Sequence, residues 1–226
     1  MIMARGASNL RACACACACA LAAGALAAGA CAGAEASDAV IAATGVEGSA
    51  ADVAQSSTHF RLAPWPRRGQ QPDFRLVDAD GRPRKLADYR GRVVVVLFGF
   101  VHCPDVCPAE LFKLSVVMKK LGLTSDRVQV LFVTLDPERD TRTVLKGYVG
   151  AFDPRFVGLT GSTAEVAAAA EHFFVEYAKV GDGADYTIDH STSTFVLDAR
   201  GRLRLVGAMN ASIEDYAHDL AALAAE

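Results

Sequence analysis

Two cysteines separated by three residues are the part of this sequence best suited to chemistry. Cys103 and Cys107 are the two of seven cysteines that follow residue 31. One close pair cannot form a framework of disulfides, and it is more typical of a redox couple or of two metal ligands. A disulfide across so short a loop would add only about 2 kcal/mol of stability, which argues against a purely structural bridge.

The segments on either side predict where this pair lies. Residues 93–98 form a continuous apolar run of β-formers, which indicates a central strand covered on both faces. Leu111, Leu114, Met118 and Leu121 then recur at helical spacing. The cysteines therefore lie between the carboxyl end of a strand and the start of a helix, where sites form in open α/β sheets. Backbone N–H groups at such a helix start stabilise thiolates and lower cysteine pKa values.

The rest of the chain alternates between strands and helices, which predicts a mixed sheet with helices on both faces. This is an α/β thioredoxin-like fold, with a central mixed β-sheet flanked by helices and an N-terminal hairpin extension. The further elements expected are a hairpin over 74–86 turning at Asp80-Gly81, a buried strand over 128–135, a short helix capped by Asp140 and stopped by Gly150, an Ala-rich helix begun by the capping box of Ser162 and Glu165, a short strand over 174–180, a hairpin over 193–206 and a last helix capped by Ser212.

Composition excludes several classes of function. The 226 residues are 52% hydrophobic and 22% charged, which suits one packed domain with a tail and not a disordered chain. The net charge of −3 and the lack of a basic stripe argue against nucleic-acid binding. The sequence contains no P-loop, GxGxxG or haem-attachment motif.

The N-terminal residues 1–34 have the features of an export leader. Arg5 and Arg11 precede an uncharged run over 12–34, which is long enough for a membrane span of about 20 residues. Cys31 follows Ala28-Gly29-Ala30, as in lipoprotein processing sites. A signal peptide, a lipoprotein leader and a membrane anchor stay open, and each predicts a body at the periplasmic or extracytoplasmic face of the inner membrane. Residues 35–68 are expected to be a flexible tether, and 69–226 the folded, thioredoxin-like domain.

Three segments together resemble the Sco/SenC family of copper proteins, the assembly factors of cytochrome c oxidase. They are residues 99–108 around the cysteines, residues 135–141 with the sequence LDPERDT, and residues 186–191. The resemblance runs from about Phe74 to the C-terminal helix. It implies a thioredoxin-like fold and one copper ion bound by Cys103, Cys107 and His190.

The residues themselves suit this chemistry. Cu(I) is soft, prefers thiolates and accepts imidazole. A spacing of four residues brings two sulfurs onto one face of a helical turn, and His190 precedes the strand expected beside the first central strand. The site should be shallow, as metal transfer requires. His102 is adjacent to Cys103 but should point elsewhere. Asp136 is expected to pair with Arg139, and the alternative that its carboxylate approaches the site and aids Cu(II) binding stays open. His59, His172 and His218 are expected in solvent, and Phe98, Phe100, Phe112 and Met118 in the core.

Two functions stay open. The first is a membrane-tethered, extracytoplasmic copper chaperone that delivers copper to a cuproprotein, foremost the dinuclear copper site in the receiving subunit of a haem–copper oxidase. The second is a thiol–disulfide oxidoreductase that keeps target cysteines reduced, with a periplasmic thiol-redox partner. The Cys-x-x-x-Cys spacing and the histidine in Asp189-His190-Ser191, where thioredoxins have a proline, favour metal binding. A peroxiredoxin would need Thr in place of Phe100, and structural zinc would need a fourth ligand.

Overall fold

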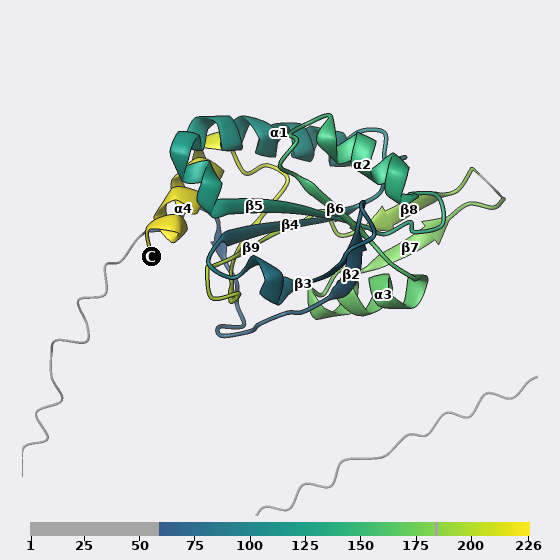
Figure 1. Ribbon diagram of the computed structural model, residues 1–226, viewed down its shortest axis with the longest axis horizontal. Coiled ribbons are helices and arrows are strands. Elements are labelled where there is room, and N and C mark those ends of the chain that lie inside the picture. The colour runs from purple at the N-terminus through teal and green to yellow at the C-terminus, as the bar shows by residue number, and fades with distance from the viewer. Residues whose placement is uncertain (1–58, 184) are drawn as a thin grey trace, which may run out of the picture. The chain divides into compact units, whose positions relative to one another are not determined.

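The computed structural model describes residues 59–183 and 185–226. The predicted leader and most of the predicted tether lie outside these residues, and within them no helix is long and apolar enough to cross a membrane. An eight-stranded sheet in the order β1-β10-β9-β4-β5-β6-β2-β3 organises the domain, and β7 and β8 form a separate pair (Figure 1). The strands are β1 (Ala63–Pro64), β2 (Arg75–Asp78), β3 (Pro83–Lys85), β4 (Val93–Gly99), β5 (Val128–Thr134), β6 (Val157–Thr160), β7 (Tyr177–Val180), β8 (Thr187–His190), β9 (Thr194–Leu197) and β10 (Leu203–Gly207).

The centre of the sheet is mixed, as predicted. Strand β4 runs parallel to β5 and antiparallel to β9, and β5 runs parallel to β6. All seven residues of β4 and all seven of β5 are buried. Alternate residues of β4 enter two different cores: Val93, Val95 and Leu97 pack in one, while Val94, Val96 and Phe98 pack in the other. The unbroken apolar run in the sequence therefore reflects a strand covered on both faces.

Helices cover both faces of this sheet. Side chains of α1, α2 and α4 join the core that contains Val95, whereas those of α3 join the core that contains Val96, on the opposite side of the sheet (Figure 1). Phe98, Phe100 and Met118 lie in these cores as predicted. The helices are α1 (Val106–Leu121), α2 (Arg142–Gly150), α3 (Thr163–His172) and α4 (Ile213–Ala225), with 3-10 turns over Leu86–Tyr89 and Gly122–Arg127.

The prediction that Phe112 lies in the core is wrong. Its side chain is 63% exposed, whereas its neighbour Leu111 is fully buried. Successive residues of a helix point roughly 100° apart, so Phe112 lies off the apolar stripe that α1 presents to the sheet.

The predicted helix starts are confirmed for α3 and α4 but not for α2. Ser162 and Glu165 form the predicted capping box, and Ser212 caps α4. The cap of α2 is Thr141, whose hydroxyl accepts a hydrogen bond from the Val144 N–H at 3.4 Å. Asp140 is instead fully buried, so its carboxylate serves the interior and not the helix end.

The folded part begins earlier than the predicted boundary at residue 69. Strand β1 pairs with β10, and Leu62 is buried. The backbone N–H groups of Arg61 and Leu62 donate to the buried carboxylate of Asp219, the latter at 2.7 Å. The two-residue strand carries no periodic pattern, which explains why it escapes detection in the sequence.

Candidate metal-binding site

The two cysteines flank the start of α1. Cys103 lies in the loop after β4, and Cys107 is the second residue of the helix. The N–H of Cys107 donates to the Sγ of Cys103 at 3.4 Å, and both cysteines are free thiols. The local turn therefore brings both sulfurs to the carboxyl end of β4, as the spacing predicts.

His190 reaches this pair from a distant part of the chain. It ends β8, 83 residues beyond Cys107, and its Nε2 lies 3.8 Å from the Cys107 Sγ. Its Nδ1 lies 2.8 Å from the carbonyl oxygen of Ser191. A carbonyl can only accept, so Nδ1 carries the proton and the Nε2 lone pair faces the thiol. The next strand, β9, pairs with β4 as predicted, and this pairing brings the histidine to the cysteines.

The two sulfurs differ in accessibility. Cys103 is half-buried, whereas Cys107 is 1% exposed. Burial raises the pKa of the Cys107 thiol well above its usual range. The expected thiolate-stabilising effect of the helix start is therefore outweighed at Cys107, because a charged sulfur there would lose its hydration. The expectation of a shallow site holds for Cys103 and fails for Cys107.

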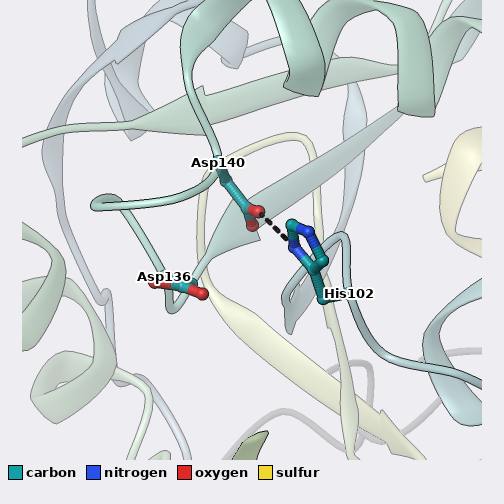
Figure 2. Close-up of side chains that lie close together, drawn as sticks. All are labelled: His102, Asp136 and Asp140. Carbon is teal, nitrogen blue, oxygen red and sulfur yellow. Dashed lines mark ion pairs between the residues drawn. The ribbon is translucent and has the colours of Figure 1, made fainter. Parts of the chain in front are cut away.

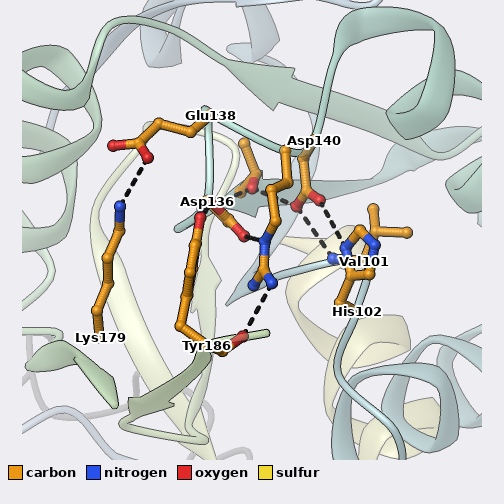
Figure 3. Close-up of polar contacts among 9 residues, drawn as sticks. Val101, His102, Asp136, Glu138, Asp140, Lys179 and Tyr186 are labelled. Atoms are coloured by element: carbon orange, nitrogen blue, oxygen red, sulfur yellow. Dashed lines mark hydrogen bonds and ion pairs between the residues drawn. The ribbon is translucent and has the colours of Figure 1, made fainter. Parts of the chain in front are cut away.

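Asp136 has the structural role that its spacing to Arg139 predicts. Its buried carboxylate forms an ion pair with Arg139 and accepts a hydrogen bond of 2.6 Å from the Tyr186 hydroxyl. Arg139 also donates to the Tyr186 carbonyl and lies 3.6 Å from the centre of its ring. Tyr186 precedes β8, and Lys179 of β7 pairs with Glu138 at 2.8 Å (Figure 3). These contacts attach the hairpin that carries His190 to the loop after β5.

Asp140 is the residue near this site that the sequence-based prediction misassigned. Its Oδ2 accepts hydrogen bonds from the Val101 N–H at 3.0 Å and from the Thr134 hydroxyl at 2.6 Å. Its Oδ1 faces His102 Nδ1 at 3.8 Å (Figure 2). His102 thus points toward Asp140 in the loop after β5, in agreement with the prediction that it points elsewhere than the copper site. The only sequence signal for this arrangement is the four-residue spacing of Asp136 and Asp140.

The other three histidines lie at the surface, as predicted. His59, His172 and His218 are exposed. His172 contacts the carbonyl of Asp73 at 2.7 Å, and His218 contacts Asp219 at 2.7 Å. None of these contacts involves a cysteine.

Comparison with known proteins identifies the family. The model of the family described as SCO1/SenC matches residues 64–225. The mitochondrial SCO2 homologue of Mus musculus is 46% identical over 135 residues, which are 58% of this chain and 53% of the relative. The human homologue is 45% identical over 137 residues, 58% of this chain and 51% of the relative. The chain thus spans about half the length of these curated relatives.

Solved structures share the fold. ScoI of Bradyrhizobium japonicum with copper bound is 36% identical, with a TM-score of 0.62, 66% of this chain and 96% of that chain covered. Apo Sco1 of Thermus thermophilus is 38% identical, with a TM-score of 0.67 and coverages of 73% and 96%. Yeast Sco1 with copper bound is 32% identical, with a TM-score of 0.61 and coverages of 66% and 85%. The predicted thioredoxin-like fold is confirmed, and the chain belongs to the SCO1/SenC family.

Proposed function

We propose that this protein is an extracytoplasmic copper chaperone that binds one copper ion through Cys103, Cys107 and His190. The observation that carries this proposal is the 3.8 Å approach of His190 Nε2 to the Cys107 Sγ, beside the second thiol. Solved relatives at 36% and 32% identity are described with copper bound, which supports copper as the cargo.

The donor set fits copper in its reduced state. Two thiolates and one imidazole are soft ligands, and Cu(I) accepts three of them. The Ser191 carbonyl holds the His190 ring with Nε2 free to bind. The Cys107 thiol, whose pKa is raised by burial, must release its proton when the metal enters.

The difference in exposure suggests how copper is passed on. Cys103 and His190 are both half-buried and can be approached by a partner, whereas Cys107 is enclosed. A receiving thiolate or imidazole can therefore replace the accessible ligands first and the buried one last. The family resemblance favours the dinuclear copper site of cytochrome c oxidase as the recipient, with another cuproprotein as the alternative.

The predicted leader supports a location at the periplasmic or extracytoplasmic face of the inner membrane, with the domain held there by an anchor or a lipid. A phosphatase reporter that requires export, fused after Glu226, should be active. Mass spectrometry of the mature N-terminus then separates cleavage, lipidation at Cys31 and retention of the leader. A reporter active only in the cytoplasm would exclude this location.

Anaerobic Cu(I) titration against a competing chelator tests the metal site. The full chain is used with its five leader cysteines replaced by Ser, so that the thiols counted are those of the domain. We expect one tightly bound ion, lost in Cys103→Ser and Cys107→Ser and strongly weakened in His190→Ala. His59→Ala, at an exposed histidine, is the matched control and should bind as the parent does. Full copper retention in Cys107→Ser would refute the site.

A thiol–disulfide reductase is the second candidate, and the two free thiols in hydrogen-bond contact favour it. Cys103 is the accessible thiol and would attack the target disulfide, and Cys107 would then displace the reduced target. Two thiols of the domain are oxidised to one disulfide as one target disulfide becomes two thiols. Cys107→Ser should trap the mixed disulfide, and Cys103→Ser should not. If neither variant forms one, this function is excluded.

A further inference from the structure

The proposed copper site leaves a second group of potential ligands unused. His102, Asp136 and Asp140 each offer one donor atom, and these three atoms lie within 4.8 Å of one another (Figure 2). His102 comes from the loop after β4, and the two carboxylates come from the loop between β5 and α2. The fold therefore brings together one imidazole and two carboxylates from two different loops.

The carboxylate of Asp140 is incompletely satisfied. The residue is fully buried, and its Oδ2 accepts two hydrogen bonds, from Val101 and Thr134. Its Oδ1 is also buried but has no hydrogen-bond partner. A buried carboxylate oxygen without a donor is costly, so a cation that binds at this oxygen would stabilise it.

The distance from Asp140 Oδ1 to His102 Nδ1 suits a bridging cation. It is 3.8 Å, which is too long for a hydrogen bond. Two ligand atoms that each lie about 2.0–2.2 Å from one metal ion are themselves about 3–4 Å apart. The observed separation falls within that range.

Charge and access also permit a cation. The cluster contains the two carboxylates of Asp136 and Asp140 and one guanidinium, from Arg139, which pairs with Asp136. The oxygens of Asp136 accept hydrogen bonds from Arg139 and Tyr186, and a carboxylate offers about four lone-pair positions in all. The two carboxylates of the cluster therefore outnumber its one guanidinium. The His102 side chain is 55% exposed, so an ion can arrive from solvent.

We propose that His102 Nδ1, Asp140 Oδ1 and a carboxylate oxygen of Asp136 bind a divalent transition-metal cation, of the class of Cu(II) or Zn(II). One imidazole and two carboxylates are harder ligands than two thiolates, so this group favours a divalent ion over Cu(I). Because His102 precedes Cys103 directly in the sequence, the loop after β4 contributes one ligand to this hard site and one to the soft site. The hard site holds its ion without using either thiol.

The test uses the full chain with all seven cysteines replaced by Ser, which removes the thiols as ligands and as reductants. Zn(II) binding is measured by calorimetry, and Cu(II) binding by electron paramagnetic resonance. We expect one ion per chain, with its affinity lowered more than about tenfold by His102→Ala and by Asp140→Asn. The nitrogen hyperfine signal of bound Cu(II) should be lost in His102→Ala. The exposed His59→Ala is the matched control and should leave both signals unchanged.

Two results would overturn this site. Absence of Zn(II) and Cu(II) binding would show an ordinary His102–Asp140 ion pair. Binding that is lost in His190→Ala and kept in His102→Ala would assign the ion to the other histidine. The folding of Asp140→Asn is checked by circular dichroism, because Asp140 also accepts a hydrogen bond from the Val101 N–H. If this variant does not fold, the test relies on His102→Ala, which changes an exposed side chain. The experiment contains no cysteine, so its outcome is independent of the proposed Cu(I) site.

Discussion

Gly99 packs against the Cys107 side chain, so the methyl group added by Gly99→Ala would clash with a ligand of the proposed copper site. A Cβ at position 99 would lie 2.6 Å from the Cys107 Sγ and 3.0 Å from the Phe132 ring. Favourable contacts between such atoms are about 3.5–4.0 Å, so the sulfur must move by roughly 1 Å. Phe132 is fully buried in the centre of the sheet, where side chains are closely packed, so its ring cannot move aside without cost.

The cost follows from this overpacking. An additional methyl group in a well-packed core destabilises a protein by about 1–3 kcal/mol. In a domain of this size each kcal/mol lowers the melting temperature by about 2–4 °C, so Gly99→Ala should melt about 2–12 °C lower. The Cys107 Sγ must also change its 3.8 Å separation from His190, so Cu(I) affinity should fall together with stability.

Gly147→Ala is the matched control. Gly147 is an exposed residue of α2 with no atom within 4 Å of its added Cβ. Ala is favoured over Gly in a helix by about 0.5–1 kcal/mol, so the melting temperature should stay or rise slightly and Cu(I) affinity should not change. Thermal unfolding of the apo-proteins and Cu(I) competition titration measure both quantities. If Gly99→Ala matches Gly147→Ala in both measurements, the close packing of Gly99 against Cys107 is refuted.

Three further predictions follow from burial and from the polar contacts. Phe112→Ser should change the unfolding free energy by less than about 0.5 kcal/mol, whereas Phe100→Ala should cost about 3–5 kcal/mol in denaturant titrations, because only the second side chain is buried. Burial raises the pKa values of Cys107 and Tyr148 in the folded state. The unfolded chain then releases these protons at lower pH than the folded chain does. The melting temperature should therefore decrease as pH rises above about 9, and this decrease should be smaller in Cys107→Ser. Tyr186→Phe removes the hydrogen bond to Asp136, so limited proteolysis should cut the β7–β8 hairpin faster than in the parent, and an unchanged cleavage rate would show that this bond does not hold the hairpin.

Local patterns in the sequence were sufficient for most of the fold. The apolar run over 93–98 predicts a doubly covered strand because both of its faces are apolar, and Ser162 with Glu165 predicts a helix start because the two residues satisfy each other's backbone. The short strands β1, β6 and β8 were missed, since two to four residues carry too little periodicity. Phe112 was misassigned because an aromatic residue within a helix suggests burial, whereas its angular position on α1 decides it.

The cysteine pair and its place at a strand end follow from the sequence alone, because the two sulfurs are close along the chain. The tertiary structure decided what surrounds them. His190 is 83 residues from Cys107 and reaches it only through the pairing of β9 with β4. The burial that raises the pKa of Cys107 depends on tertiary packing. So does the role of Asp140, whose carboxylate accepts a hydrogen bond from the Val101 N–H instead of capping α2. The spacing of residues along the chain predicts which ligand side chains are local neighbours. The burial of those side chains and their hydrogen-bond partners depend on packing between distant segments.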